Sequence, residues 1–253
     1  MSESRVEELE LIRMFSFGKV QHFGGSLSCI ELLTCLYFHE MRYSAQLKDD
    51  PERDRFILSK GHSVPAQYVI LSMLGIFPMS ELRTIKQLGS RFQGHPDSTK
   101  PPGIEAPTGS LGRGLSFANG VALAARLDSR NFKIFVLLGD GELQGGQVWE
   151  AAMTSAHHRL TNVCVLVDCN KFQSQGSVQE IKGNEPLEEQ WAAFGWGVIP
   201  VAIIASTVKG KGVSFMENSF KYHNCSLTEQ EHRAAEREIL DQIRSRKHVE
   251  SES

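Results

Sequence analysis

Long apolar stretches alternate with amphipathic segments along most of this chain. Two apolar runs of strand length lie in the middle, at 132–138 and 162–168, and a shorter one lies at 55–59. A segment with helical spacing, at about 147–159, separates the two middle runs. Strands that are apolar on both faces are typical of a parallel sheet covered by helices on both sides. The pattern predicts a doubly wound α/β fold with a mostly parallel sheet.

Helical spacing of apolar residues covers much of the remaining chain. An opening helix carries Val6, Leu9 and Ile12, and Ser28 is placed to cap a second helix. The segment 89–114 is rich in glycine and proline, so we expect a long loop, which in a compact domain is usually functional. Further helices are expected at about 64–74, 80–88, 116–127 and 186–195.

The end of the chain contains another strand pattern and a helix signal. Residues 201–208 have the composition of a strand. Thr228 and Glu231 have the spacing of a capping box, in which each side chain bonds the other's backbone amide. We expect a charged terminal helix that begins at about residue 228 and continues to about Arg246.

The composition is that of an ordinary globular protein, with 41% hydrophobic and 23% charged residues in a chain of 253. A net charge of −3 gives no basic surface for nucleic acid. No apolar run approaches the roughly 20 residues of a membrane helix, and the acid-rich start does not resemble a secretory signal. Five cysteines without a CxxC pair favour a reduced, cytoplasmic protein over a disulfide framework or a zinc ribbon.

Polar residues follow both middle strands. A Gly-Asp-Gly-Glu motif at 139–142 ends the first strand, and Asp168 and Asn170 end the second. Because ligands of such sheets bind beyond the carboxyl ends of the strands, Asp140 and Asn170 are expected to lie close together. One carboxylate and one amide oxygen make a hard oxygen site, suited to a magnesium or calcium ion that carries a phosphate-bearing ligand. Taken alone, the motif is equally compatible with an ordinary turn.

Glycine-containing loops supply further candidates. Thr108 to Ser116 has the order GxxGxG and opens a helix, which disfavours a Rossmann site but leaves amides that attract phosphate. His22, His62 and His95 lie near glycines in three other loops. They fit a site that hydrogen-bonds a polar, phosphorylated substrate. A metal site is the alternative, but no HxxxH or HExxH spacing supports it.

Six ordered motifs resemble the N-terminal half of the transketolase family. Gly-Asp-Gly, followed after 28 intervening residues by Asn170, is similar to the thiamine diphosphate signature. The other five are similar in order and spacing: Arg53–His62, Gln93–Pro96, Thr108–Ser116, Gln147–Ala152 and Thr207–Gly212. The resemblance runs from about residue 10 to 223. It implies the N-terminal subunit of a split transketolase, with residues 1–253 forming a single thiamine diphosphate-binding domain of the pyrophosphate type and a helical tail from about 228.

The resemblance also implies an activity and a set of site residues. The activity is transfer of a two-carbon ketol unit from a ketose phosphate to an aldose or its phosphate. A magnesium or calcium ion would bind Asp140, Asn170 and the backbone carbonyl of Phe172. The expected catalytic histidines are two that match diphosphate contacts, His62 and His223, and two near the thiazolium and the substrate hydroxyls, His22 and His95. The other expected cofactor contacts are Gly112, Gly114, Gly139, Asp140, Gly141, Glu142 and Asn170.

A partner chain follows from the same resemblance. The family's cofactor-activating glutamate lies on a pyrimidine-binding domain, and nothing in this sequence resembles that domain. We therefore expect the partner to be a C-terminal transketolase subunit, in a homodimer or a heterotetramer that binds neither nucleic acid nor membrane. The alternative is a cofactor-binding or regulatory subunit that has lost turnover. A related synthase with a keto-acid donor is disfavoured by Gln93-Gly-His-Pro96.

Departures from the family pattern bear on these expectations. Gly145 stands where the family has a glutamate, part of a proton network that includes the residue matching Glu150. Arg113 replaces a usual glutamine and adds a cation beside the phosphate site. Only Pro200 separates two segments that match successive family strands, although a parallel crossover needs roughly 10–12 residues. We therefore expect residues to be missing at Pro200, and a rebuilt region is the alternative.

Overall fold

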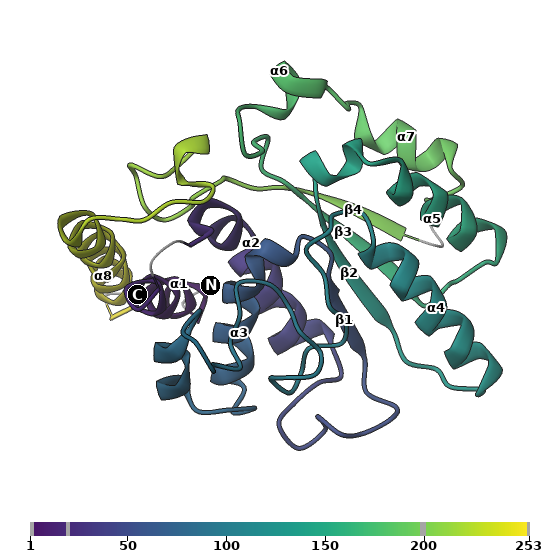
Figure 1. Cartoon of the computed structure of the whole chain (residues 1–253), viewed down its shortest axis with the longest axis horizontal. Coiled ribbons are helices and arrows are strands. Elements are labelled where there is room, and N and C mark those ends of the chain that lie inside the picture. Colours follow the sequence, from purple (N-terminus) through teal and green to yellow (C-terminus); the bar gives the residue numbers. More distant parts are fainter. Residues whose placement is uncertain (1–2, 19–20, 198–200, 252–253) are drawn as a thin grey trace.

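A parallel sheet in the order β1-β2-β3-β4 is the centre of this computed structural model, which describes residues 3–18, 21–197 and 201–251 (Figure 1). The strands are β1 (Arg55–Leu58), β2 (Ile134–Gly139), β3 (Val163–Cys169) and β4 (Val201–Ser206). The α-helices are α1 (Glu3–Phe15), α2 (Phe23–Cys35), α3 (Val64–Met73), α4 (Gly114–Leu127), α5 (Gly146–His157), α6 (Val178–Lys182), α7 (Leu187–Ala193) and α8 (Glu229–Ser251). Short 3₁₀ segments lie at Gly61–Ser63, Met79–Thr84, Gly141–Gln144 and Phe220–Tyr222, and a π-helical turn at Leu36–Glu40.

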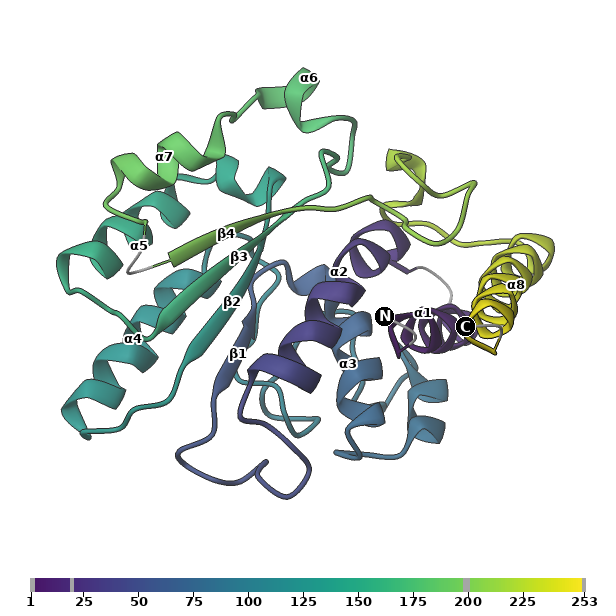
Figure 2. The same ribbon diagram turned by 180° about the vertical axis from the view of Figure 1, so that it is seen from behind.

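Both faces of the sheet are buried, as the apolar runs predict. Phe135 and Leu137 of β2 pack in one apolar layer with α1, α2 and α3. Ile134, Val136 and Leu138 belong to a second layer with α4, α5 and α7. Figures 1 and 2 show these two groups of helices on opposite sides of the sheet. The doubly wound α/β prediction is confirmed.

The register of the central strands sets the position of the site. Ile134 of β2 lies opposite Val163 of β3, and Gly139 lies opposite Asp168. Both strands therefore end at the same edge, where Asp140 follows β2 directly. The predicted loop after residue 89 is also present, since no helix or strand lies between Thr84 and Gly114.

Two helix predictions are wrong in detail. Ser28 lies inside α2, which begins at Phe23, and its hydroxyl donates to the Asp168 carboxylate (2.6 Å) instead of capping a helix. The helix expected at 80–88 is reduced to a 3₁₀ segment ending at Thr84. Lys86 has a left-handed backbone (φ 57°) and its amide bonds to the carbonyl of Phe92. The chain therefore turns back on itself where a helix would have continued.

The return from β3 to β4 passes through α6 and α7. Gly195 ends α7 with a left-handed backbone (φ 83°). Trp196 is buried against Trp191, and its indole donates to the Ala152 carbonyl (3.0 Å). The segment before Pro200 that matches a family strand is therefore not extended at Trp196, which lies in this packed turn. Pro200, where we expected missing residues, lies outside the described part of the chain.

The terminal helix begins as its capping box predicts. The Thr228 hydroxyl accepts from the Glu231 amide (3.2 Å), and the Glu231 carboxylate accepts from the Thr228 amide (2.8 Å). Helix α8 packs against α1, so the first and last helices lie side by side (Figure 2). Among the described helices, none is both long and apolar enough to cross a membrane.

Candidate functional site at the edge of the sheet

A small cavity of about 160 Å³ opens where β2 and β3 end. Eight of the residues expected to form the site line it: His62, Gly139, Asp140, Gly141, Glu142, Asn170, Phe172 and His223. No role was predicted for the other lining residues, which are Gly25, Lys60, Leu111, Gln173, Ser174 and Lys209. The cavity thus combines residues from α2, the ends of three strands and the loop after β4.

Asp140 is held rigidly at the end of β2. One carboxylate oxygen accepts from the amide of Gly141 (2.8 Å) and the other from the amide of Lys171 (2.5 Å). Lys171 has a left-handed backbone (φ 67°), a strained conformation that directs its amide toward the carboxylate. Burial raises the pKa of Asp140 to about 6, and the nearby Asp168 adds to the rise. A cation bound at this carboxylate would favour its ionised form.

Asn170 and Phe172 bring two more oxygen atoms to the same place. The Asn170 side-chain nitrogen faces the Asp168 carboxylate (3.1 Å), and its oxygen accepts from the Phe172 amide (3.1 Å). The Phe172 carbonyl accepts from the Lys209 ammonium group (3.1 Å), which shows that this oxygen points into the cavity. The carboxylate of Asp140, the amide oxygen of Asn170 and this carbonyl are hard ligands that fit a divalent ion.

These ligands differ from the clusters that bind transition metals. No group of three His, Cys, Asp or Glu side chains suited to a metal ion occurs in the described residues. One carboxylate and two neutral oxygens leave coordination positions on magnesium free for water and phosphate oxygens. The residues therefore fit the expected ion.

Two buried lysines bring positive charges to the cavity, which the carboxyl groups of Asp140 and Glu142 also line. Burial by itself lowers the pKa of Lys60, but its ion pair with Asp168 and the smaller effects of Cys29 and Asp140 together raise this pKa above its usual value. Lys209 is only 1% exposed, and burial together with the charge of Lys60 lowers its pKa to about 8. Lys209 also contacts His223 Nδ1 (2.9 Å), so the ring proton of His223 lies on Nε2 when the lysine is charged. An anionic ligand would offset these charges.

The four expected histidines come together beside the cavity. The ring centre of His22 lies 5.3 Å from that of His62, 5.9 Å from that of His95 and 5.6 Å from that of His223. Burial lowers the pKa of His22 to about 4 and that of His223 to about 3, and it holds the pKa of His62 well below its usual value. These rings are neutral near pH 7. Each can therefore donate one hydrogen bond and accept another.

The glycine-rich loop is fastened beneath the cavity by Glu142. This carboxylate accepts from the amides of Gly112 (2.7 Å) and Gly139 (3.0 Å) and from the Ser59 hydroxyl. Ser59 in turn accepts from the amide of Gly114 (3.1 Å). Gly112 and Gly114 are therefore bonded to side chains of this protein, and the Glu142 carboxylate acts by holding the loop in place.

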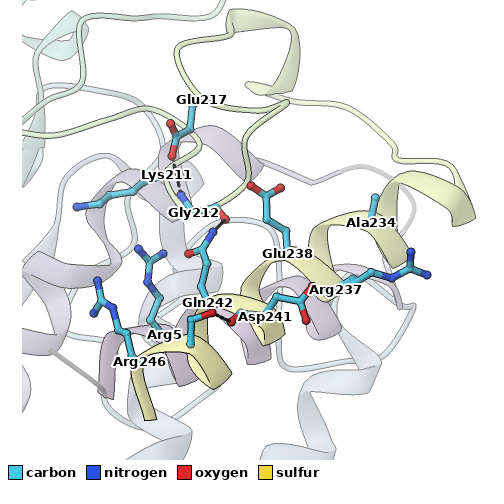
Figure 3. Close-up of a pocket in the computed structure, with 11 residues that line it drawn as sticks. Arg5, Lys211, Gly212, Glu217, Ala234, Arg237, Glu238, Asp241, Gln242 and Arg246 are labelled. Carbon is cyan, nitrogen blue, oxygen red and sulfur yellow. Dashed lines mark hydrogen bonds between the residues drawn. The ribbon is translucent and has the colours of Figure 1, made fainter. Parts of the chain in front are cut away.

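A second hollow lies away from the histidines. This groove of about 830 Å³ is formed by α8, the start of α1 and the loop at 211–217 (Figure 3). Two of the four basic side chains that line it have anionic partners, since Arg5 pairs with the buried Glu8 and Lys211 with Glu31, both at 2.5 Å. Glu217, Glu238 and Asp241 also line the groove, and none of the residues expected to form the site lies in it.

The chain is similar to known proteins over nearly its whole length. The sequence model of the family described as "Transketolase, thiamine diphosphate binding domain" matches residues 6–206. One of the subunits of apulose-4-phosphate transketolase from Phocaeicola vulgatus is 36% identical, and the match covers 95% of this chain and 94% of that protein. The 6-deoxy-6-sulfo-D-fructose transketolase subunit SqwG of a Clostridium species is 40% identical, with 94% and 98% covered.

Two longer proteins named transketolase match over less than half of their length. Human transketolase is 32% identical over 90% of this chain and 40% of its own. The crystal structure of transketolase from Campylobacter jejuni has a TM-score of 0.86 and 27% identity, with 94% of this chain and 42% of that one covered. The chain therefore corresponds to a whole subunit of the first pair of relatives and to one part of these longer proteins.

Proposed function

The chain belongs to the transketolase family, whose thiamine diphosphate-binding domain it contains, and we propose that it is the N-terminal subunit of a two-chain transketolase. In this proposal residues 1–253 form one cofactor-binding domain with α8 as its tail. The observation that carries it is the cavity where Asp140, Asn170 and Phe172 meet two buried lysines. The proposed location of the protein is the reducing cytoplasm, which its five free cysteines support.

The site holds the diphosphate end of the cofactor through a divalent ion. Asp140, Asn170 and the Phe172 carbonyl bind magnesium, and Lys209 offsets the remaining phosphate charge. When bound, thiamine diphosphate supplies the electron sink for breaking a carbon–carbon bond next to a carbonyl. The protein's own contribution is to orient the reacting groups and to hold protons at defined atoms.

The histidines are placed to handle protons and hydroxyl groups. His62 and His223 lie in the wall of the cavity, whereas His22 and His95 lie further out. His22 Nδ1 is buried without a hydrogen-bond partner among the described residues, which supports a role in binding a ligand. In the proposal these two outer rings hydrogen-bond the hydroxyls of a sugar phosphate, while His62 and His223 contact the diphosphate.

The partner is a C-terminal subunit with the pyrimidine-binding domain. The relatives named as transketolase subunits are covered almost completely by this chain, which supports a division of the enzyme at the same point. Helices α4 and α5 expose the apolar side chains of Phe117 and Met153. These exposed apolar side chains support a homodimer, which the partner extends to a heterotetramer.

One residue favours the alternative of a cofactor-binding subunit without turnover. Gly145, at the start of α5, is exposed and has no side chain to join a proton network with Glu150. The two functions predict different results in a two-chain assay with thiamine diphosphate, magnesium, a ketose phosphate and an aldose phosphate. A catalytic subunit gives ketol transfer with the C-terminal chain and none by itself.

The same assay distinguishes the two ways in which the catalytic proposal can fail. Formation of a complex that binds cofactor without transferring the ketol unit would replace the catalytic proposal with the regulatory one. Full turnover by this chain alone would contradict the need for a partner. Replacement of Gly145 by glutamate provides a control for the alternative, because it restores the family residue at an exposed position.

A further inference from the structure

Asp168 lies directly beneath the proposed metal site. It is fully buried in β3, and its carboxylate contacts four side chains from separate parts of the chain. One oxygen accepts from Lys60, from Ser28 (2.6 Å) and from the side-chain nitrogen of Asn170 (3.1 Å). The other oxygen accepts from the Thr207 hydroxyl. A single buried carboxylate thus connects α2, the end of β1 and the ends of β3 and β4.

Two contacts determine which way the Asn170 amide group points: its nitrogen donates to Asp168 (3.1 Å), and its oxygen accepts from the Phe172 backbone amide (3.1 Å). An ionised carboxylate can only accept hydrogen bonds, so the NH₂ end of Asn170 must face Asp168. Ser28 donates to the same carboxylate oxygen, which leaves its own lone pair facing the Asn170 nitrogen (3.4 Å). A reversed amide would place its oxygen against the carboxylate, two acceptors without a proton between them. The Asn170 oxygen is therefore directed toward the cavity.

We propose that Asp168 is a positioning residue that fixes the Asn170 amide with its oxygen toward the divalent ion. This inference rests on the proposed function, because it assumes that Asn170 is a ligand. Lys60 keeps Asp168 charged and also donates to the Gly25 carbonyl (2.9 Å), which joins the network to α2. The alternative is that the buried ion pair only stabilises the fold.

A matched pair of variants separates these two roles. Ser28→Ala and Thr207→Val each remove one hydroxyl that donates to Asp168. Ser28 bonds the carboxylate oxygen that holds Asn170, whereas Thr207 bonds the other oxygen. If the network acts only on the fold, the two variants lose manganese affinity to the same extent. If it orients Asn170, Ser28→Ala weakens the affinity and Thr207→Val does not.

The measurement is manganese binding by electron paramagnetic resonance, made on the two-chain complex with thiamine diphosphate. Urea unfolding of each variant is recorded alongside. We expect Ser28→Ala to lose about 3- to 10-fold in affinity and Asp168→Asn about 10- to 100-fold, the range typical of residues that orient metal ligands.

Asp140→Ala distinguishes failure of this inference from failure of the proposed function. If Asp140→Ala abolishes manganese binding while Ser28→Ala and Thr207→Val have equal affinities, only the positioning role is wrong. If Asp140→Ala also binds manganese normally, the metal site itself is wrong. Should Asp168→Asn fail to fold, the comparison of the two hydroxyl variants still decides the question.

Discussion

A single methyl group added at the start of α4 should distort the glycine-rich loop at 108–116. A Cβ atom on Gly114 would lie 2.4 Å from Ser59 Cβ and 2.8 Å from its Cα, so backbone must move. Gly114→Ala also displaces the Ser59 hydroxyl, which accepts from the Gly114 amide and donates to Glu142. The change therefore strains both the helix start and its attachment to the sheet.

The size of the effect follows from these contacts. Overpacking in a close-packed site costs about 1–3 kcal/mol, and a weakened hydrogen bond adds about 1 kcal/mol. Alanine recovers at most about 0.5–1 kcal/mol of backbone entropy relative to glycine. We expect Gly114→Ala to lower the free energy of unfolding by about 2 kcal/mol, or roughly 30-fold in the equilibrium constant.

Gly120→Ala is the matched control, because it adds the same methyl group to the same helix. A Cβ atom there meets nothing within 4 Å, so we expect a gain of about 0.5–1 kcal/mol. The assay is urea unfolding of both variants and the wild type, with sedimentation to record assembly. Thiamine diphosphate affinity is measured on the same samples and should fall in Gly114→Ala only. Equal stability of the two variants would refute the reasoning.

Three further predictions follow from other contacts. Burial lowers the pKa of His22 to about 4, against about 6.5 in an unfolded chain, so the wild type loses stability as pH falls from 6.5 to 4. The loss is at most about 1.4 kcal/mol per pH unit, and less for a partly exposed ring. Urea titrations should show the free energy of unfolding of His22→Asn rising relative to that of the wild type as the pH falls over this range. A difference in free energy that does not change with pH would contradict the burial of His22. Glu142→Gln should lower the free energy of unfolding by about 1–3 kcal/mol, because the new NH₂ group would face the backbone amide of Gly112 or of Gly139, which is also a donor. A midpoint of urea unfolding equal to that of the wild type would count against the attachment of the loop. Thr228→Ala should lower the free energy of unfolding by about 1 kcal/mol through loss of the capping box, whereas Thr228→Ser should keep the capping box. Identical urea unfolding curves of the two variants would exclude a stabilising role of this cap.

The sheet could be predicted from the sequence because burial on both faces leaves a strong signal in β2 and β3. The position of Asp140 near Asn170 followed from the same signal, since parallel strands end at one edge. Ser28 was assigned wrongly because capping rules are local. Its hydroxyl is bonded to Asp168, a residue 140 positions away in the sequence.

The orientation of the lysines could not be predicted. Lys209 and Lys211 lie in one Lys-Gly-Lys-Gly motif, but Lys209 is buried in the site and Lys211 pairs with Glu31 at the surface. A left-handed turn at Gly210 (φ 74°) lies between the two lysines. A Cβ atom at Gly210 would lie 2.4 Å from the Met216 carbonyl oxygen, so this turn depends on tertiary packing that the motif alone does not reveal.

The central claim is that a divalent ion at Asp140 and Asn170 holds thiamine diphosphate in this chain. Calorimetric titration of the cofactor into the two-chain complex, with and without magnesium, tests it most directly. Asp128→Ala, an exposed carboxylate after α4, is the control for Asp140→Ala. We predict magnesium-dependent binding by the wild type and the control, and a loss of more than about 100-fold in Asp140→Ala, beyond the cost of losing a residue that only orients a ligand. Unchanged cofactor affinity in Asp140→Ala would contradict the claim.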